Sequence, residues 1–409
     1  MEKIKVAVVG LRRGSTFLKL FGKDFSETTV VAVCDGDEER IEQLRKEELI
    51  TPEIAVYDDY DKMLDEQEID AVMLANFFHE HASYAIKAMN KGIAVLSETT
   101  AAPSLGDCVD LVEAQERTNA KYMLAANCLY FPGLHAMKEK VESGKYGELF
   151  TGYAEYFHGS DALENPVIDL EADTHWRKFL PASYYNMHSL GPLMYVTGTV
   201  PVKVSCKAVH KPEFTKARAK VEDTPTAMVI TEMDNGAVFS TTGCSNQRPA
   251  TKWYRLSFSG GNLETVRYDG GQFNLVEANA KEETFSTTKY NWVSAGVIDG
   301  ENYVKGTAEN SGHGGIDYFV AYYFIQYMLG KHEPFLNIYR SVALSAAGII
   351  GWYSALSDGQ EYRIPDFSKK EDRDKVRGDY RMPFAKRYAD LTLPCRLQDK
   401  DQFTGFDFK

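Results

Sequence analysis

The sequence predicts an α/β domain with a doubly wound parallel sheet, followed by an α+β domain with a largely antiparallel open sheet. In the first part of the chain, short apolar runs alternate with helical patterns, as in βαβ units. Further along, strand-like runs follow one another in series, which favours antiparallel pairing. We predict a first domain over residues 1–128, a second over 129–357 and a C-terminal tail over 358–409.

The first domain is predicted from short apolar strands separated by more polar helices. The expected strands are 4–9, 30–34, 54–57, 70–75, 93–97 and 121–126. The expected helices are 16–22, 37–46, 59–65, 79–91 and 103–118. Ligands of open parallel sheets bind outside the carboxyl ends of the strands. The residues that directly follow these strands are therefore the candidate site.

The second domain is predicted from alternating strand patterns and two strongly apolar helices. The expected strands are 148–158, 202–209, 226–233, 237–242, 253–258 and 263–267, and the expected helices are 132–143, 316–329 and 340–356. The last helix contains a run of small residues, 345–348, that permits close packing on a neighbour. Residues 163–176 are a polar, acidic insertion, and the tail is charged with few periodic patterns.

Composition restricts the class of partner. The chain has 409 residues and a formal net charge of −13, which disfavours nucleic acid and anionic membranes as partners. Six scattered cysteines without C-x-x-C spacing indicate buried thiols in a reducing compartment. The sequence shows neither a signal peptide nor an apolar run of membrane-spanning length. We therefore expect a cytoplasmic protein.

The first strand, helix and second strand form a candidate dinucleotide-binding unit. Gly10 and Gly14 provide a tight turn and a close approach to a pyrophosphate at the helix N-terminus. Asp35 ends the second strand, where an acid can accept both ribose hydroxyls of NAD. The G-x-G-x-x-G pattern is incomplete, so an ordinary strand-to-helix turn is the alternative.

The middle of this turn, Leu11-Arg12-Arg13-Gly14-Ser15, is basic and polar. Arg12 or Arg13 can reach a phosphate, including the 2′-phosphate of NADP, and the alternative for both is a solvated turn. Asp35 would repel that phosphate, which favours NAD over NADP. With Ser15, these residues are the predicted phosphate end of the cofactor site.

Polar residues also follow the fourth and fifth strands. Asn76, His79 and His81 follow the fourth strand, and Glu98 follows the fifth. Glu98 is a candidate to hold the nicotinamide ribose or a sugar hydroxyl, or else a helix N-terminal acid favoured by the dipole. His81 is a supporting residue of the cofactor site or a packed histidine. The His79/His81 spacing does not match a usual zinc pair, so we predict no metal.

These strand-end motifs resemble those of the Gfo/Idh/MocA oxidoreductase family, whose first domain is a Rossmann fold. The resemblance rests on the N-terminal unit, on Asn76-Phe77-Phe78-His79-Glu80-His81 and on Val95-Leu96-Ser97-Glu98-Thr99-Thr100. Dehydrogenases of that family have a lysine that assists hydride transfer at the position of Thr99. A threonine cannot act as a cationic acid at neutral pH, which argues against that mechanism.

Three further motifs resemble the branch of NAD-dependent glycoside hydrolases typified by α-N-acetylgalactosaminidases, which also lack the lysine. They are Trp176-Arg177, Tyr185-Asn186-Met187-His188-Ser189-Leu190-Gly191-Pro192 and Gly312-His313-Gly314-Gly315-Ile316-Asp317. Tyr130 falls where that branch has a catalytic tyrosine.

The resemblance implies a cycle that begins when NAD takes a hydride from C3 of a pyranoside. The proton then leaves C2 and the aglycone leaves C1. Water adds to the sugar, and NADH returns the hydride. Tyr130 is then the C2 base. Tyr185 and His188 are three residues apart and would share one face of a helical turn, and they take the proton of the C3 hydroxyl. Trp176 and Arg177 line the sugar pocket, and His313 faces the substrate. Core packing or helix capping is the alternative role for each of these side chains.

Two other functions stay open. One is a net NAD(P)-dependent sugar or polyol dehydrogenase, and the other is a noncatalytic cofactor-binding sensor. The resemblance also implies a homo-oligomer formed through the antiparallel sheet. The sequence does not identify the sugar, its anomeric form, the leaving group or the number of subunits.

Overall fold

The computed structural model describes residues 2–159, 175–244, 246–267, 273–300, 305–384 and 393–408. The predicted acidic insertion lies outside the described residues up to residue 174. The chain forms two compact units. Unit 1 contains Met1–Pro103, Asp107–Asn127 and Tyr303–Val342, and unit 2 contains Ser104–Gly106, Cys128–Asn302 and Ala343–Lys409.

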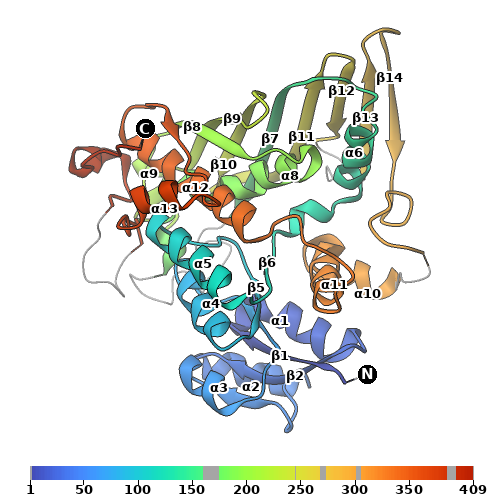
Figure 1. Ribbon diagram of the computed structural model, residues 1–409, viewed down its shortest axis with the longest axis vertical. Helices are drawn as coiled ribbons and strands as arrows, with labels where there is room; N and C mark the ends of the chain where they lie inside the picture. The colour runs from blue at the N-terminus through green and yellow to red at the C-terminus, as the bar shows by residue number, and fades with distance from the viewer. Residues whose placement is uncertain are drawn as a thin grey trace. The chain divides into compact units, whose positions relative to one another are not determined.

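Unit 1 is built on a six-stranded parallel sheet, which confirms the predicted doubly wound fold (Figure 1). The strand order is β3-β2-β1-β4-β5-β6. The central strand β1 is apolar and buried from Val6 onward, with Val6, Ala7 and Val8 at most 1% exposed. The strands are β1 (Ile4–Val9), β2 (Thr28–Cys34), β3 (Ala55–Tyr57), β4 (Ala71–Leu74), β5 (Ala94–Ser97) and β6 (Tyr122–Leu124).

The helices of unit 1 begin at capping residues that the sequence supplies. Asp37 and Asp59 accept hydrogen bonds from backbone N–H groups at the starts of α2 and α3. The first helix begins at residue 11, earlier than predicted, because its arginine-rich first turn has no apolar pattern. The helices are α1 (Leu11–Lys19), the π-helical turn η1 (Leu20–Asp24), α2 (Glu38–Lys46), α3 (Tyr60–Glu66), α4 (His81–Asn90), α5 (Leu105–Thr118), of which residues 105–106 belong to unit 2, and α10 (Lys305–Glu309).

The apolar helix α11 (Ile316–Met328) belongs to unit 1 although it is distant in sequence. The ring of Phe324 lies 6.3 Å from that of Phe21, and the rings of Tyr318 and Phe25 are 4.9 Å apart. The helix is therefore apolar because it packs in the core of this unit. Among the described helices, none combines the length and the hydropathy that spanning a membrane requires.

Unit 2 is built on a nine-stranded sheet with the order β14-β13-β12-β11-β7-β10-β9-β8-β15. Its described pairs are antiparallel except β7 with β10, so the predicted, largely antiparallel sheet is confirmed. The strands are β7 (Leu149–Gly159), β8 (Pro201–Ala208), β9 (Thr226–Met233), β10 (Val238–Cys244), β11 (Asn246–Phe258), β12 (Gly261–Thr265), β13 (Asn274–Asn279), β14 (Thr284–Lys289) and β15 (Tyr362–Arg363).

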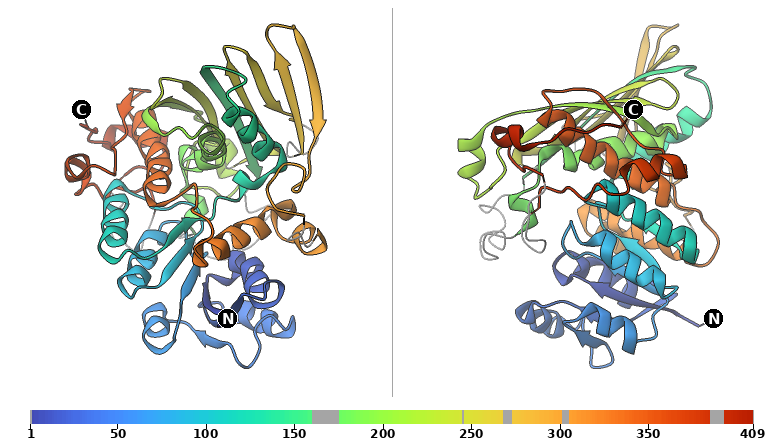
Figure 2. Two further views of the ribbon diagram at one scale, coloured as in Figure 1. Left: turned by 45° about the vertical axis from the view of Figure 1, so that its right-hand side comes forward. Right: turned by 60° about the vertical axis from the view of Figure 1, so that its left-hand side comes forward.

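Two helices, α6 (Pro132–Glu142) and α8 (Met187–Thr197), lie on one face of this sheet (Figure 2). The opposite face exposes apolar side chains, because Met228 and Ile230 alternate along β9 with buried residues. Tyr153 and Val238, on the neighbouring strands, are also exposed. Sequence patterns missed β13 and β14, which are rich in polar residues.

The C-terminal tail is more ordered than its sequence predicts. It contributes β15, which pairs with β8, the helix α13 (Lys370–Val376) and the 3₁₀ helix η7 (Leu397–Gln402). Tyr353, on the long helix α12 (Ile338–Leu356), contacts Phe403 and Phe406, each with ring centroids 5.2 Å apart. The tail thus packs through a few aromatic residues whose irregular spacing gives no periodic pattern.

Candidate functional site

The turn between β1 and α1 requires its two glycines. Gly10 has a φ of +82°, and a Cβ atom there would lie 2.4 Å from the backbone of Ala75, after β4. A Cβ at Gly14 would lie 2.8 Å from the side chain of Val8. The glycines therefore seat the N-terminus of α1 at the carboxyl edge of the parallel sheet. The N–H groups and positive dipole end of such a terminus suit a pyrophosphate.

Asp35 lies where the ribose-binding acid is expected. One carboxylate oxygen accepts a hydrogen bond from the N–H of Leu11, and the other accepts one from the N–H of Asp37 at 2.9 Å. Each oxygen retains a further lone pair, so the carboxylate can still accept two hydroxyl groups. The glycine turn and this held carboxylate fit a dinucleotide, and the adenine ribose would be held by Asp35.

The two arginines of the turn contact carboxylates. Nη2 of Arg12 lies 2.7 Å from Asp37, and the Arg12 side chain is 49% exposed. Arg13 points to Glu98 and Asp317. The hydroxyl of Ser15 donates to the carbonyl of Arg12 at 3.0 Å, within the turn. Phosphate contacts by these three residues stay predictions.

The loop after β4 is held by His81, at the start of α4. Its Nδ1 lies 2.9 Å from the carbonyl oxygen of Thr100, and its Nε2 lies 3.2 Å from that of Asn76. Burial lowers the pKa of His81. His81 thus joins the loops after β4 and β5. His79 is buried nearby, and the side-chain oxygen of Asn76 is buried without a hydrogen-bond partner in the described structure.

Glu98 belongs to an ion-pair network that sequence patterns did not reveal. Its carboxylate accepts from Nε of Arg13 at 2.7 Å, and the two Nη atoms of Arg13 donate to Asp317 at 2.7 and 2.9 Å. Asp317 also accepts from Nδ2 of Asn127 at 3.0 Å and lies 2.9 Å from Nδ1 of His313. Asp317 is fully buried.

The pKa of Asp317 reflects these contacts. Burial by itself would raise the pKa of this carboxyl group, but the hydrogen bond from His313 and the charge of Arg13 hold it below the ordinary value. Asp317 is therefore an anion that binds an arginine 304 residues away in sequence. Sequence patterns gave no indication of this contact.

In unit 2, Tyr185 and His188 lie together as predicted from their spacing. Tyr185 is in the 3₁₀ helix η5 (Ala182–Asn186), His188 is in the first turn of α8, and their ring centroids are 4.9 Å apart. Nη1 of Arg177 donates to the Tyr185 hydroxyl at 3.4 Å. The guanidinium also lies 4.4 Å from the ring of Trp176. Trp176 and Arg177, the two predicted substrate-binding residues, thus adjoin the predicted pair of Tyr185 and His188.

Two further aromatic residues of β7 join this cluster. Tyr156 stacks on His188 with centroids 4.5 Å apart and an interplanar angle of 27°. The ring of His158 lies 5.8 Å from that of Tyr185. The period of a strand places Tyr156 and His158 on the same face, so the predicted strand 148–158 already contained the pattern that would have identified them.

Tyr130 lies in the 3₁₀ helix η2 (Asn127–Tyr130), which adjoins α8. Sγ of Cys128 lies 3.9 Å from Nδ1 of His188. Tyr130 is 7% exposed, and its carbonyl accepts from the indole N–H of Trp292 at 3.2 Å. The same short helix therefore carries Tyr130 and a direct neighbour of His188, while the role of Tyr130 as a base stays a prediction.

Close backbone packing fixes η5 and the start of α8. A Cβ at Gly243 on β10 would lie 2.2 Å from the carbonyl oxygen of Ala182, and one at Gly348 on α12 would lie 3.0 Å from that of Ser183. The small residues of α12 thus permit the close packing predicted for them.

Burial raises the pKa of Tyr254, whose phenol donates to the carbonyl of His188 at 2.8 Å.

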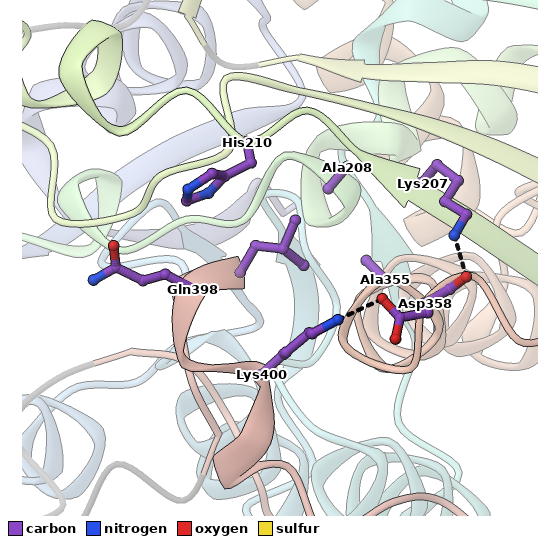
Figure 3. A pocket seen from close by; sticks show the side chains of 8 residues that line it. Lys207, Ala208, His210, Ala355, Asp358, Gln398 and Lys400 are labelled. Atoms are coloured by element: carbon purple, nitrogen blue, oxygen red, sulfur yellow. Dashed lines mark hydrogen bonds and ion pairs between the residues drawn. The ribbon is translucent and has the colours of Figure 1, made fainter.

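A separate hollow of unit 2 contains none of these residues. It has a volume of about 380 Å³, and Lys207 and Lys400 on its wall both bond to Asp358 (Figure 3). His210, also on its wall, lies 3.1 Å from Asp223. Its charged groups are thus engaged with one another. Over the part of the chain that the structure describes, three or more His, Cys, Asp or Glu side chains nowhere form a group suited to a metal ion.

Comparisons with known proteins agree with this architecture. Residues 4–126 match the oxidoreductase family with an NAD-binding Rossmann fold, and residues 204–373 match the C-terminal domain of glycosyl hydrolase 109. A glycosyl hydrolase family 109 protein of Streptomyces coelicolor is 26% identical over 411 residues, which cover 92% of this chain and 85% of that protein. An α-N-acetylgalactosaminidase of Tannerella forsythia is 23% identical over 387 residues, covering 83% and 81%.

Solved structures share the fold at low identity. Levoglucosan dehydrogenase in complex with NADH and L-sorbose matches with a TM-score of 0.71 at 17% identity, covering 90% of this chain and 100% of that one. An aldose-aldose oxidoreductase from Caulobacter crescentus matches with a TM-score of 0.67 at 14% identity, covering 89% and 100%. Residues 4–126 are therefore similar to the NAD-binding Rossmann domain of the oxidoreductase family, and residues 204–373 are similar to the C-terminal domain of glycosyl hydrolase 109.

Proposed function

We propose that this protein is an NAD-dependent enzyme that cleaves a glycoside without net oxidation, by transient oxidation of the C3 hydroxyl of a pyranoside. The main support for this proposal is the packing of Tyr185 on His188, with Arg177 beside the Tyr185 phenol. These are proton-transfer and anion-stabilising groups of the types that oxidation of a hydroxyl requires. The family 109 relatives and the absence of the family lysine at Thr99 support cleavage over net dehydrogenation.

Unit 1 supplies the cofactor residues. The helix terminus after Gly10 holds the pyrophosphate, and Asp35 accepts the adenine ribose hydroxyls. The side-chain oxygen of Asn76, which is buried without a partner in the described structure, would accept a hydrogen bond from the cofactor. The chemistry that NAD would supply when bound is reversible hydride transfer at the sugar. We propose NAD over NADP because a 2′-phosphate would meet the carboxylate of Asp35.

Unit 2 supplies the residues that move protons and hold the sugar. His188 and Tyr185 take the proton of the C3 hydroxyl, and Tyr130 takes the proton of C2, which a C3 ketone makes acidic. Arg177 stabilises negative charge on the Tyr185 oxygen. Trp176, which contacts the guanidinium of Arg177, is assigned to the wall of the sugar pocket.

A panel of p-nitrophenyl glycosides, including the α-N-acetylgalactosaminide, tests this function. The protein is incubated with each compound with and without NAD⁺, and nitrophenol and NADH are followed together. We expect NAD-dependent release of nitrophenol without accumulation of NADH. In D₂O the released sugar gains deuterium at C2, because that proton is removed and replaced. NADH formed in proportion to product would contradict the proposal and favour a net dehydrogenase.

Matched variants test the site. His188→Gln and Tyr185→Phe are expected to lower kcat by about 100-fold, the usual contribution of acid–base catalysis. His210→Gln, in the separate hollow of unit 2, serves as the control and retains full turnover. Full turnover of both site variants would contradict the assignment of Tyr185 and His188.

A further inference from the structure

We propose that His313 is a proton-transfer residue of the ligand site, that Nε2 is the acting atom and that Asp317 positions it. The inference rests on the proposed function and adds a third group that moves protons. His313 and Asp317 are four residues apart, across the start of α11, and both belong to unit 1.

The first step concerns the hydrogen bond of His313. Its Nδ1 lies 2.9 Å from Oδ2 of Asp317, which is fully buried and accepts two hydrogen bonds from Arg13. An ionised carboxylate only accepts hydrogen bonds, so Nδ1 of His313 carries the proton and donates. In the neutral ring, Nε2 then has the lone pair and can accept a proton.

The second step concerns access to the ring. The His313 side chain is 39% exposed, and its Nε2 has no hydrogen-bond partner among the described residues. Asp317 is meanwhile held by Asn127 and Arg13 in addition to the histidine. The carboxylate is therefore fixed from several sides, while the ring that it orients has one edge open to a ligand.

The third step concerns the backbone, which is arranged to allow this pair. His313 has a φ of +57°, a conformation that side-chain-bearing residues rarely adopt. The two following glycines also have positive φ values. A Cβ at Gly312 would lie 2.2 Å from Oδ2 of Asp317, so glycine leaves room for the carboxylate. The turn thus holds a histidine in an unfavourable conformation beside the acid that orients it.

The fourth step places the pair near the predicted ligand. Arg13, bound to Asp317, also donates to Glu98, which directly follows β5. The carboxyl ends of parallel strands are where ligands of this fold bind. The lone pair of Nε2 can therefore take a proton from a hydroxyl group of a ligand held at this edge, while the oxygen keeps its bonding electrons. The reverse transfer restores the neutral ring.

The first test reads the tautomer and does not depend on turnover. In protein labelled with ¹⁵N in its nine histidines, His313→Gln identifies the signals of His313. We expect the neutral ring to carry its proton on Nδ1, and Asp317→Asn to remove that preference. A wild-type ring protonated on Nε2 would overturn the inference.

The second test reads turnover on whichever glycoside the wild type cleaves. His313→Gln is expected to lower kcat by about 100-fold with KM changed less than about threefold. Asp317→Asn acts through the histidine and is expected to lower kcat by about 10-fold. The control is His332→Gln, a histidine of unit 1 packed against Tyr323. Its kcat should be unchanged.

The two failures are distinguishable. A wild type that cleaves no glycoside contradicts the proposed function, and the tautomer still shows whether Asp317 orients His313. Normal wild-type cleavage with His313→Gln retaining kcat within about threefold of the wild type contradicts the present inference alone. In that outcome, the contact of His313 with Asp317 only stabilises the turn before α11.

Discussion

Tyr156 on β7 stacks on His188 on α8 with ring centroids 4.5 Å apart, a contact that the spacing of residues in the sequence did not predict. Tyr254 holds the backbone carbonyl of His188, and Tyr156 restricts its ring. The imidazole is thus positioned by two tyrosines of the sheet before any substrate binds. Such preorganisation is worth more to a proton transfer than to binding.

The first prediction concerns this stacking. Tyr156→Leu removes the aromatic face, and we expect kcat on the cleaved glycoside to fall by about 10-fold because the imidazole is less well held. Tyr156→Phe keeps the ring and serves as the matched control. Steady-state kinetics of both variants check the prediction. If Tyr156→Leu and Tyr156→Phe have equal kcat values, the stacking of an aromatic ring on His188 does not contribute to turnover.

The second prediction concerns the choice of cofactor. Asp35→Asn keeps an oxygen for the N–H of Leu11 but removes the negative charge. We expect the ratio of the Kd values for NADP⁺ and NAD⁺ to fall by about 10-fold, since each 1.4 kcal/mol of repulsion corresponds to a factor of ten. Calorimetric titration measures both constants. An unchanged ratio would mean that Asp35 does not face the adenine ribose.

The sequence predicted both folds because each signal is local. Strand runs such as β1 and the alternation along β9 are readable over a few residues, and so is the spacing of Tyr185 and His188. The contact of Arg13 with Asp317 joins residues 304 positions apart and has no local pattern. Tertiary packing alone decides that Arg13 faces carboxylates in this structure.

The third prediction concerns the glycine turn. Gly10→Ala is expected to lower the free energy of unfolding by about 2 kcal/mol or more, because of the positive φ and the contact with Ala75. Gly36→Ala is the matched control, since a Cβ there meets no atom within 4 Å. Denaturant unfolding of both variants gives the comparison. A Gly10→Ala protein as stable as the control would contradict the geometry of the turn.

The fourth prediction concerns pH. The pKa of Asp317 is lowered in the folded protein, so its contribution to stability is present above the unfolded pKa of about 4 and is lost as the pH falls below it. Asp317→Asn leaves Arg13 with the carboxylate of Glu98 alone, and we expect a loss of about 3 kcal/mol at pH 7, because a buried ion pair is broken. The difference in Tm between the wild type and this variant should stay nearly constant from pH 6 to about pH 4 and shrink as the pH is lowered further, because linkage acts between the unfolded and the lower folded pKa. A difference that stays constant with pH would show that the charge of Asp317 is not responsible.

The last prediction concerns the exposed face of the sheet in unit 2. Met228 and Ile230 on β9 are exposed, with Val238 on β10 and Tyr153 on β7 beside them, although apolar side chains on a strand are normally buried. We propose that this face joins two copies of the chain. Ile230→Glu would place a charge in that interface and should halve the molar mass measured by light scattering, because an unpaired buried charge opposes association. Thr231→Val lies on the buried face of the same strand and is the control, since it leaves the exposed face unchanged. A wild type that is monomeric at micromolar concentration would contradict the proposed interface directly.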